Sequence, residues 1–326
     1  MSSEATGLRD AFRGALLGTF VGDALGAPVE GWSATRIRRE LGEVRDMKEG
    51  RRGKGVYTDD TQMMIALAEA LLEDRELDPE RLARHLASSY DGDRGYGRGT
   101  TDVFRRLRAG EPWESAAEGS MPRGSFGNGA AIRVAPAALL LHHSAEELER
   151  LAEDTALTTH PHPLGVAGCL LQARQVAAGV LLRGRTVDPV MVAVELRSAA
   201  VSLEFRQKLR TVEEFLEKGA TPELVHDRLG CNSSALGSVP TALYCFLARA
   251  QSFEEAIVFA VNLGGDADSI AAMTGAIAGA YHGAHAIPRR WRIALEEGEK
   301  GAAYVEHLAD GLLERHLELR RPRGSR

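Results

Sequence analysis

Two aspartates, Asp266 and Asp268, lie two positions apart in a stretch of small and apolar residues, 256–280. Ionised carboxylates in an apolar setting cost free energy unless they are paired with a cation or bind a metal. No Lys or Arg occurs between Arg249 and Arg289, so the local sequence offers no basic partner. Mg²⁺ and Ca²⁺ prefer carboxylate, hydroxyl and water oxygens. A hard-cation site is therefore one way to satisfy both aspartates.

A second oxygen-rich cluster, Thr58-Asp59-Asp60, stands just before a segment with helical periodicity, 63–73. Helix capping is one explanation, because Thr58 or Asp59 suits an N-cap and Gln62 would complete a capping box with Asp59. Capping accounts for one hydroxyl and one carboxylate. It leaves Asp60 without a role, so a second cation site stays open as an alternative.

Glu30 is the third candidate, in a turn after Pro28, which is expected to end the first helix. An ordinary exposed acid is one interpretation. If Glu30 and the two aspartate clusters converge, five carboxylates meet, and they cannot all stay ionised without a counter-charge. One divalent ion would leave such a cluster strongly negative, so we expect two. Paired metals about 3.5–4 Å apart are a known catalytic device.

Two further segments could contact a ligand. The glycine-rich run 124–129 precedes a predicted helix, 130–142, and could hold phosphate on backbone N–H groups, or it could be a simple turn. His160 and His162 could bind a transition metal, but the interleaved prolines favour a rigid turn.

The elements that must position these residues are predicted to be helices. Helical periodicity recurs from end to end with short connections, and no segment shows sustained period-two alternation. We expect an all-α chain of roughly a dozen helices. The main predicted loops are 91–101 and 230–240, and 36–52 is expected to be a loop or a short helix.

Small residues at helical spacing in the first helix, 8–25, predict a close helix–helix contact. A matching series in the late helix, 270–282, could supply the neighbour. Because these helices lie near opposite ends of the chain, we expect a single domain over residues 1–326. Its core should span 8–319, followed by a frayed basic tail, 320–326.

Composition excludes several classes of protein. The 326 residues are 44% hydrophobic and 26% charged, which is typical of a globular protein, and the net charge of −6 argues against a general nucleic-acid-binding protein. Cys169, Cys231 and Cys245 are far apart, so neither a zinc site nor a disulfide framework is expected, and a cytoplasmic location fits. No uninterrupted apolar run reaches membrane-spanning length, so no membrane partner is expected.

Four motifs in order resemble a known family. They are Gly22-Asp23-Ala24-Leu25-Gly26 followed by Glu30, Tyr57-Thr58-Asp59-Asp60-Thr61, Gly124-Ser125-Phe126-Gly127-Asn128-Gly129, and Gly264-Gly265-Asp266-Ala267-Asp268-Ser269-Ile270. Together they resemble the ADP-ribosylglycohydrolase family, which includes the dinitrogenase-reductase-activating glycohydrolase and the ADP-ribosyl-acceptor hydrolases. The resemblance covers about residues 12–284. Segment 238–246 is most similar to the branch that removes O-linked ADP-ribose, notably from serine.

The resemblance implies an orthogonal all-α bundle with two Mg²⁺ ions, or Mn²⁺, in a cleft. The implied metal ligands are Thr58, Asp59 and Asp60 for one ion and Asp266, Asp268 and Ser269 for the other. The implied substrate-binding residues are Gly124, Ser125, Phe126, Gly127, Asn128 and His160. Glu30 and Asp60 are the implied catalytic residues, with Glu30 as a base or as the gate of the metal site.

The implied activity is Mg²⁺-dependent hydrolysis of the O-glycosidic bond between ADP-ribose and protein serine, with poly(ADP-ribose) and O-acetyl-ADP-ribose as further possible substrates. The implied partners are ADP-ribosylated proteins and ADP-ribose, and the chain is expected to be a monomer. One alternative is hydrolysis of N-linked ADP-ribose on arginine, which would use the same ligands. Loops 91–101 and 230–238 are expected to decide between these linkages. Another alternative is a non-catalytic, crystallin-like relative, although both aspartate clusters are intact here.

Overall fold

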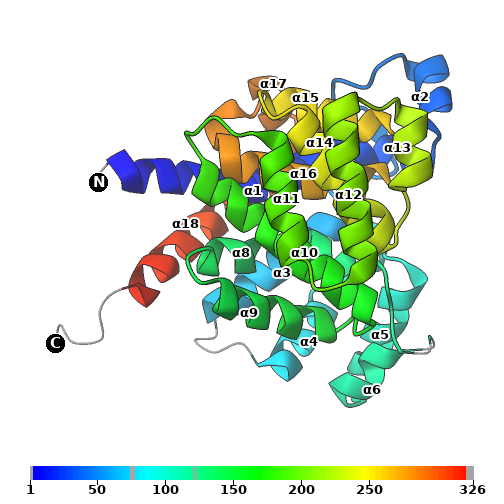
Figure 1. The fold of residues 1–326 in the computed structure, drawn as a ribbon. Coiled ribbons are helices and arrows are strands. Elements are labelled where there is room, and N and C mark those ends of the chain that lie inside the picture. The colour runs from blue at the N-terminus through cyan, green and yellow to red at the C-terminus, as the bar shows by residue number, and fades with distance from the viewer. Residues whose placement is uncertain (1–2, 74–77, 120, 122, 321–326) are drawn as a thin grey trace.

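The computed structural model describes residues 3–73, 78–119, 121 and 123–320, so the predicted tail lies outside it except for Arg320. The regular secondary structure of the described residues is helical apart from one short hairpin, which confirms the predicted all-α class (Figure 1). The first nine α-helices are α1 (Ser3–Gly26), α2 (Ala34–Leu41), α3 (Asp59–Glu73), α4 (Pro79–Ser88), α5 (Arg98–Arg108), α6 (Trp113–Glu118), α7 (Gly129–Arg133), α8 (Ala135–Leu141) and α9 (Ala145–Leu157).

The second half of the described chain continues in the same way. Its helices are α10 (Pro163–Leu182), α11 (Pro189–Ala199), α12 (Leu203–Lys218), α13 (Pro222–Arg228), α14 (Ala235–Ala248), α15 (Phe253–Asn262), α16 (Ala267–His282), α17 (Arg289–Arg292) and α18 (Ala302–Leu319). Short 3-10 helices are η1 (Ala27–Val29), η2 (Gly92–Arg94) and η3 (Ala284–Ala286). The antiparallel hairpin pairs β1 (Glu49–Gly50) with β2 (Gly53–Lys54). Whether the chain is one domain stays a prediction.

Helices α1 and α16 pack backbone to backbone at the centre of the molecule (Figure 1). A Cβ atom added to Gly18 would lie 2.1 Å from the carbonyl oxygen of Gly275, and one added to Gly14 would lie 2.2 Å from that of Gly279. Any side chain larger than hydrogen would push the helices apart, because real Cβ contacts are never this short. The predicted contact between the two small-residue helices is confirmed.

The other long helices pack around this pair. Helices α3, α10, α14, α15 and α18 all contact α1 or α16, and large side chains such as Phe12 and Phe20 are fully buried between them. Helix α10 is long and apolar enough to cross a membrane by length and composition alone, although Arg174 interrupts it. In this structure 72% of its apolar window is buried, which is the position of a core helix.

Three predicted boundaries were wrong. Helix α14 begins at Ala235, inside the predicted loop 230–240, and contains Pro240. Proline is disfavoured inside a helix, but here the Ser234 hydroxyl caps the first turn and residues 237–247 are buried, so packing outweighs local propensity. The predicted loop 91–101 contains η2 and the start of α5. The predicted helix 130–142 is divided into α7 and α8 at Val134, just before Pro136.

Candidate active site

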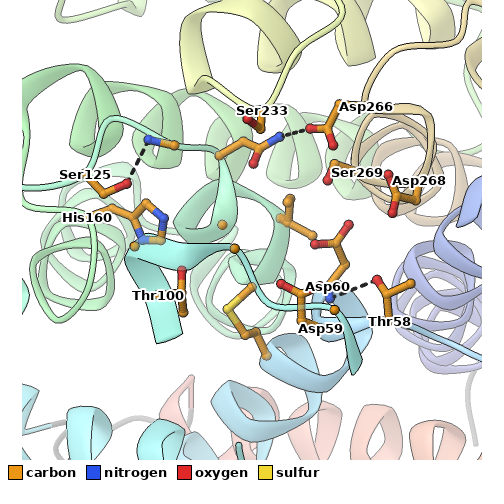
Figure 2. Close-up of a pocket in the computed structure, with 18 of the residues that line it drawn as sticks. Thr58, Asp59, Asp60, Thr100, Ser125, His160, Ser233, Asp266, Asp268 and Ser269 are labelled. Carbon is orange, nitrogen blue, oxygen red and sulfur yellow. Dashed lines mark hydrogen bonds between the residues drawn. The ribbon is translucent and has the colours of Figure 1, made fainter. Parts of the chain in front are cut away.

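One cavity of about 360 Å³ brings the predicted site residues together. All of them line it except Gly124 and Phe126. Figure 2 shows two ends. The acidic end is formed by Glu30, Thr58, Asp59, Asp60, Asp266, Asp268 and Ser269, and the glycine-loop end by Ser125, Gly127, Asn128, Gly129 and His160.

At the acidic end, Glu30, Asp266 and Asp268 each offer a carboxylate oxygen, and these oxygens lie within 4.8 Å of one another. Backbone hydrogen bonds join the segments that carry them. The N–H of Gly31 donates to the carbonyl of Gly265 at 2.7 Å, and the N–H of Gly265 donates to that of Trp32 at 2.7 Å. The turn after η1 and the turn before α16 are therefore one unit, which holds Glu30 beside Asp266.

The paired glycines make this turn possible. Gly264 and Gly265 both have φ of 71°, a conformation that side chains rarely adopt. A Cβ atom on Gly265 would lie 1.9 Å from the carbonyl oxygen of Cys231. The two glycines thus allow the chain to turn tightly between α15 and α16, so that Asp266 and Asp268 face one cavity.

The cluster at the start of α3 is held by Asp23, a fully buried residue of α1. Its carboxylate accepts hydrogen bonds from the backbone N–H groups of Thr58 and Thr61 and, at 2.6 Å, from the Thr61 hydroxyl. Asp23 stands in the first of the four family-like motifs, but the sequence alone indicated no role for it. Its position in a glycine-rich helix, where a carboxylate is unusual, was the available signal.

The predicted capping box between Asp59 and Gln62 was wrong. The Thr58 hydroxyl accepts from the N–H of Asp60 at 3.3 Å and so caps α3 (Figure 2). The Gln62 side chain instead accepts from the N–H of Asp91 and from the Tyr96 hydroxyl. Asp59 is therefore free of the capping role and lines the cavity.

Burial and mutual repulsion shift the aspartates toward the neutral form. Burial, followed by repulsion from Asp23, raises the pKa of Asp59 to about 7. Burial raises the pKa of Asp266 to about 6, although hydrogen bonds from Asn128 and Ser269 lower it. The pKa values of Asp60 and Asp268 are raised well above the usual range, first by burial and then by the neighbouring aspartate in each pair.

Two buried carboxylate oxygens at this end have no hydrogen-bond partner in the described structure. They are Asp60 Oδ2 and Asp268 Oδ1. A buried unpaired oxygen costs about 1–3 kcal/mol, and more when it is charged. The guanidinium of Arg94 reaches the same cavity, but it is bound to Glu296 and to the carbonyl of Tyr57. The acidic end therefore presents unsatisfied oxygens suited to a divalent cation.

The glycine-loop end is fixed by backbone contacts with the segment before α14. The N–H of Asn128 donates to the carbonyl of Ser233, and the N–H of Ala235 donates to that of Phe126, each at 3.0 Å. The Asn128 side chain donates to Asp266 Oδ2 at 2.6 Å and so connects the two ends (Figure 2). This part of the cavity is formed without any added group.

His160 lies between this loop and α10 and is almost completely buried. Burial lowers its pKa to about 3, so the ring is neutral at physiological pH. Its Nδ1 pairs with the Thr159 hydroxyl at 2.7 Å. A Cβ atom on Gly129 would lie 2.9 Å from His160 Cε1, so the glycine leaves room for the ring. A neutral imidazole here can hydrogen-bond a ligand without adding charge.

Gly124 and Phe126 lie outside the cavity lining. Gly124 is buried against Pro161, and the Phe126 side chain is 48% exposed and packs edge-on against His162. Their predicted roles in substrate binding stay predictions. His162 also has a structural role here, because its Nδ1 accepts from the N–H of Leu164 and caps α10.

The cavity also includes residues that the sequence did not single out. Segment 94–100 forms one wall, and Ser233 lies opposite at the Asp266 side. Both come from loops that were expected to decide the linkage, 91–101 and 230–238. Their glycine-rich, polar composition was the signal for a loop, but it could not indicate which side chains face the cavity.

Comparisons with known proteins agree on one family. The model of the ADP-ribosylglycohydrolase family matches residues 4–322. An uncharacterized protein of Archaeoglobus fulgidus is 38% identical over 96% of this chain and 99% of its own length. The ADP-ribosylhydrolase ARH3 of Bos taurus is 34% identical over 91% of this chain and 92% of its own length, and that of Homo sapiens is 32% identical over 89% and 90%.

A solved structure gives the same result for the fold. A chain described as belonging to an ADP-ribosylglycohydrolase-related protein complex superposes with a TM-score of 0.75 at 31% sequence identity. The match covers 95% of this chain and 99% of that chain, so the whole architecture is shared.

Proposed function

Because this chain belongs to the ADP-ribosylglycohydrolase family, a family of hydrolases that act on glycosidic bonds, we propose that it releases ADP-ribose from serine side chains of proteins. Poly(ADP-ribose) and O-acetyl-ADP-ribose, which carry related O-glycosidic or ester bonds, are further candidate substrates. The reaction requires divalent cations at the acidic end of the cavity.

The observation that carries the proposal is the convergence of the acidic cluster and the glycine loop on one cavity. A diphosphate can accept hydrogen bonds from the backbone N–H groups at the start of α7, which the first turn of a helix leaves without intrahelical partners. The carboxylates at the other end can stabilise the positive charge that develops on the ribose when its glycosidic bond breaks. ADP-ribose carries both groups, a diphosphate and a terminal ribose, and can therefore span the two ends.

The residues of the acidic end fit divalent cations. Asp60 and Asp268 each have a buried oxygen without a hydrogen-bond partner in the described structure, and raised pKa values mark a need for positive charge. Thr58, Asp59 and Asp60 would hold one ion, and Asp266, Asp268 and Ser269 the other. When bound, such ions orient ribose hydroxyls and lower the pKa of a water molecule. Two ions, Mg²⁺ with Mn²⁺ as the alternative, are part of the proposal.

Side chains of the cavity then stabilise the developing charge and transfer the proton. Cleavage at the anomeric carbon develops positive charge on the ribose, which the surrounding carboxylates stabilise. Glu30 is exposed at the cavity edge within reach of Asp266 and Asp268, so its carboxylate can take a proton from the attacking water. Asp60, which is buried at the same acidic end, would orient the nearby groups. The neutral ring of His160 orients the distal part of the ligand by hydrogen bonding.

The decisive experiment uses two substrates. Peptides that carry ADP-ribose on serine or on arginine are incubated with the protein, with Mg²⁺ or with EDTA, and released ADP-ribose is measured. We expect release from the serine peptide only, and none in EDTA. Release from the arginine peptide alone would contradict the serine assignment. Release from neither peptide would favour a non-catalytic relative, and release in EDTA would contradict the cation requirement.

A further inference from the structure

A second cavity of about 210 Å³ adjoins the active-site cavity, and we call it the side cavity. Glu30, Thr58, Arg94 and Gly95 line both cavities. The carboxylate of Glu30 therefore lies at the boundary between them. A group that leaves the acidic end past Glu30 enters the side cavity.

The side cavity is bordered by the β1–β2 hairpin. Arg51 and Arg52 form the hairpin turn and line the cavity, as do Gly50 and Gly53. The hairpin contacts η1, which directly precedes Glu30. The base of the hairpin, and with it the position of the two arginines, is thus tied to the segment that carries the proposed base.

Close packing fixes the hairpin at its base. Gly55 has φ of 73°, and a Cβ atom there would lie 1.7 Å from the carbonyl oxygen of Ala294. The N–H of Glu296 donates to the carbonyl of Gly55 at 2.8 Å. The hairpin is therefore anchored to the segment after α17, on the side away from its arginine turn.

One arginine of the side cavity, Arg51, carries a charge that an acidic group of a bound molecule could meet. Three arginines, Arg51, Arg52 and Arg94, face two acids, Asp93 and Glu30. Arg94 is bound to Glu296, and Arg52 donates to Asp91 at 3.3 Å. Arg51 is exposed, and the described part of the chain supplies no ion-pair partner for it. Its charge is thus available to a bound molecule.

We infer that the side cavity binds the protein segment next to the modified residue and that Arg51 selects acidic side chains in that segment. The inference rests on the proposed function. With the diphosphate at the glycine loop and the anomeric carbon at the acidic end, the bond to the acceptor points away from the glycine loop, toward Glu30. The acceptor chain then continues over Glu30 onto the hairpin, where an acidic neighbour of the modified serine meets Arg51.

A different use of these arginines is binding of the diphosphate itself. That arrangement would affect every ADP-ribosylated substrate equally, because the diphosphate is common to all of them. Selection of the acceptor segment affects only substrates that differ in flanking charge. The ratio of kcat/KM between two peptides therefore separates the two uses.

The experiment compares two ADP-ribosylserine peptides, one with two Glu on each side of the modified serine and one with two Lys on each side. We expect the wild-type protein with Mg²⁺ to prefer the Glu peptide, mainly through a lower KM. In Arg51→Glu the ratio of kcat/KM should fall by about two- to five-fold, the range expected for an exposed ion pair. Arg210→Glu, an exposed arginine on the outer helix α12, is the matched control and should keep the wild-type ratio.

Ionic strength tests whether the preference is electrostatic, and a second variant tests whether the substitution damages the hairpin. The preference should weaken as ionic strength rises from about 0.05 to 0.5 M, since exposed charges are screened. Arg51→Ala should give an intermediate ratio, and its thermal unfolding reports whether the hairpin is intact. An unchanged ratio in Arg51→Glu overturns the inference, and an equal loss on both peptides indicates the diphosphate instead. If neither peptide is hydrolysed by the wild type, the proposed function fails and this inference with it.

Discussion

The two ends of the active-site cavity present different kinds of chemical group. The acidic end consists of ionisable side chains at the starts of α3 and α16, with buried oxygens that lack partners in the described structure. The glycine-loop end consists of backbone groups and a neutral His160, held by bonds to the segment before α14. The first end leaves buried oxygens unsatisfied and would be stabilised by a cation, whereas the second is complete by itself. Loss of cation should therefore affect the two ends very differently.

The largest effect is expected for Asp268→Asn. This change removes a buried carboxylate from the centre of the acidic end, and an amide is a poorer ligand for a hard cation. We expect Mg²⁺ affinity and hydrolysis to fall by about 100-fold or more, more than for any change at Glu30. Calorimetric titration with Mg²⁺ measures the affinity directly. Glu195→Gln, an exposed acid on α11, is the control, and unchanged affinity in Asp268→Asn would contradict the metal assignment.

Glu30→Gln should separate chemistry from cation binding. The amide cannot accept a proton from water, so hydrolysis should fall by about 100-fold, within the range for general base catalysis. Mg²⁺ affinity should change less than in Asp268→Asn, because Glu30 is exposed at the cavity edge. Single-turnover hydrolysis at saturating Mg²⁺ measures the chemical step. A wild-type rate would remove Glu30 from the mechanism.

Asn128→Ala tests a side-chain contact that joins the two ends. Its amide donates to Asp266 Oδ2 at 2.6 Å and to Ser238 Oγ at 3.1 Å. Loss of a group that orients a metal ligand typically weakens binding by about 10-fold, and we expect that loss in Mg²⁺ affinity. Ser238→Ala is the matched variant, because it leaves the bond to Asp266 in place and should have a smaller effect. Equal affinities in both variants would show that the two ends act independently.

The smallest predicted effect concerns pH. Burial raises the pKa of Asp59 to about 7 and that of Asp266 to about 6, so the folded protein binds these protons more tightly than the unfolded chain does. Without a cation, stability therefore decreases as pH rises through this range, and a bound cation opposes the decrease. The difference in Tm between Mg²⁺ and EDTA should grow by about 3 °C or more from pH 5.5 to pH 8. A constant difference would mean that the cation does not bind at these carboxylates.

Much of the fold was predictable because its signals are local or repeated. The small residues of α1 and α16 predicted their close packing, and helical periodicity predicted the all-α class. Three acidic clusters at helix boundaries were identified from composition and spacing. The sequence could not show that they converge, since Glu30 and Asp266 are joined by backbone bonds between distant segments. The resemblance to a family supplied that step.

The features that were missed depend on tertiary contacts. Asp23 binds Thr61, 38 residues away, and nothing in the local sequence indicates this partnership. Pro240 lies inside a helix because the surrounding residues are buried, which local propensity cannot reveal. The exposed position of Phe126 follows from the path of the glycine loop against Pro161 and His162. Each case is decided by residues far away in the chain.

The pairing of α1 with α16 also means that the centre of the fold can form only late in synthesis. Helix α1 leaves the ribosome early, together with Asp23 and the start of α3, but its partner follows only after nearly all of the chain has been synthesised. Contacts between such distant segments slow folding, because a large loop must close before they form. The glycine face of α1 therefore has no packing partner until α16 has been synthesised. A chain that stops before Asp266 contains only the part of the acidic end that Glu30 and residues 58–60 supply, and it lacks α16, which completes the site.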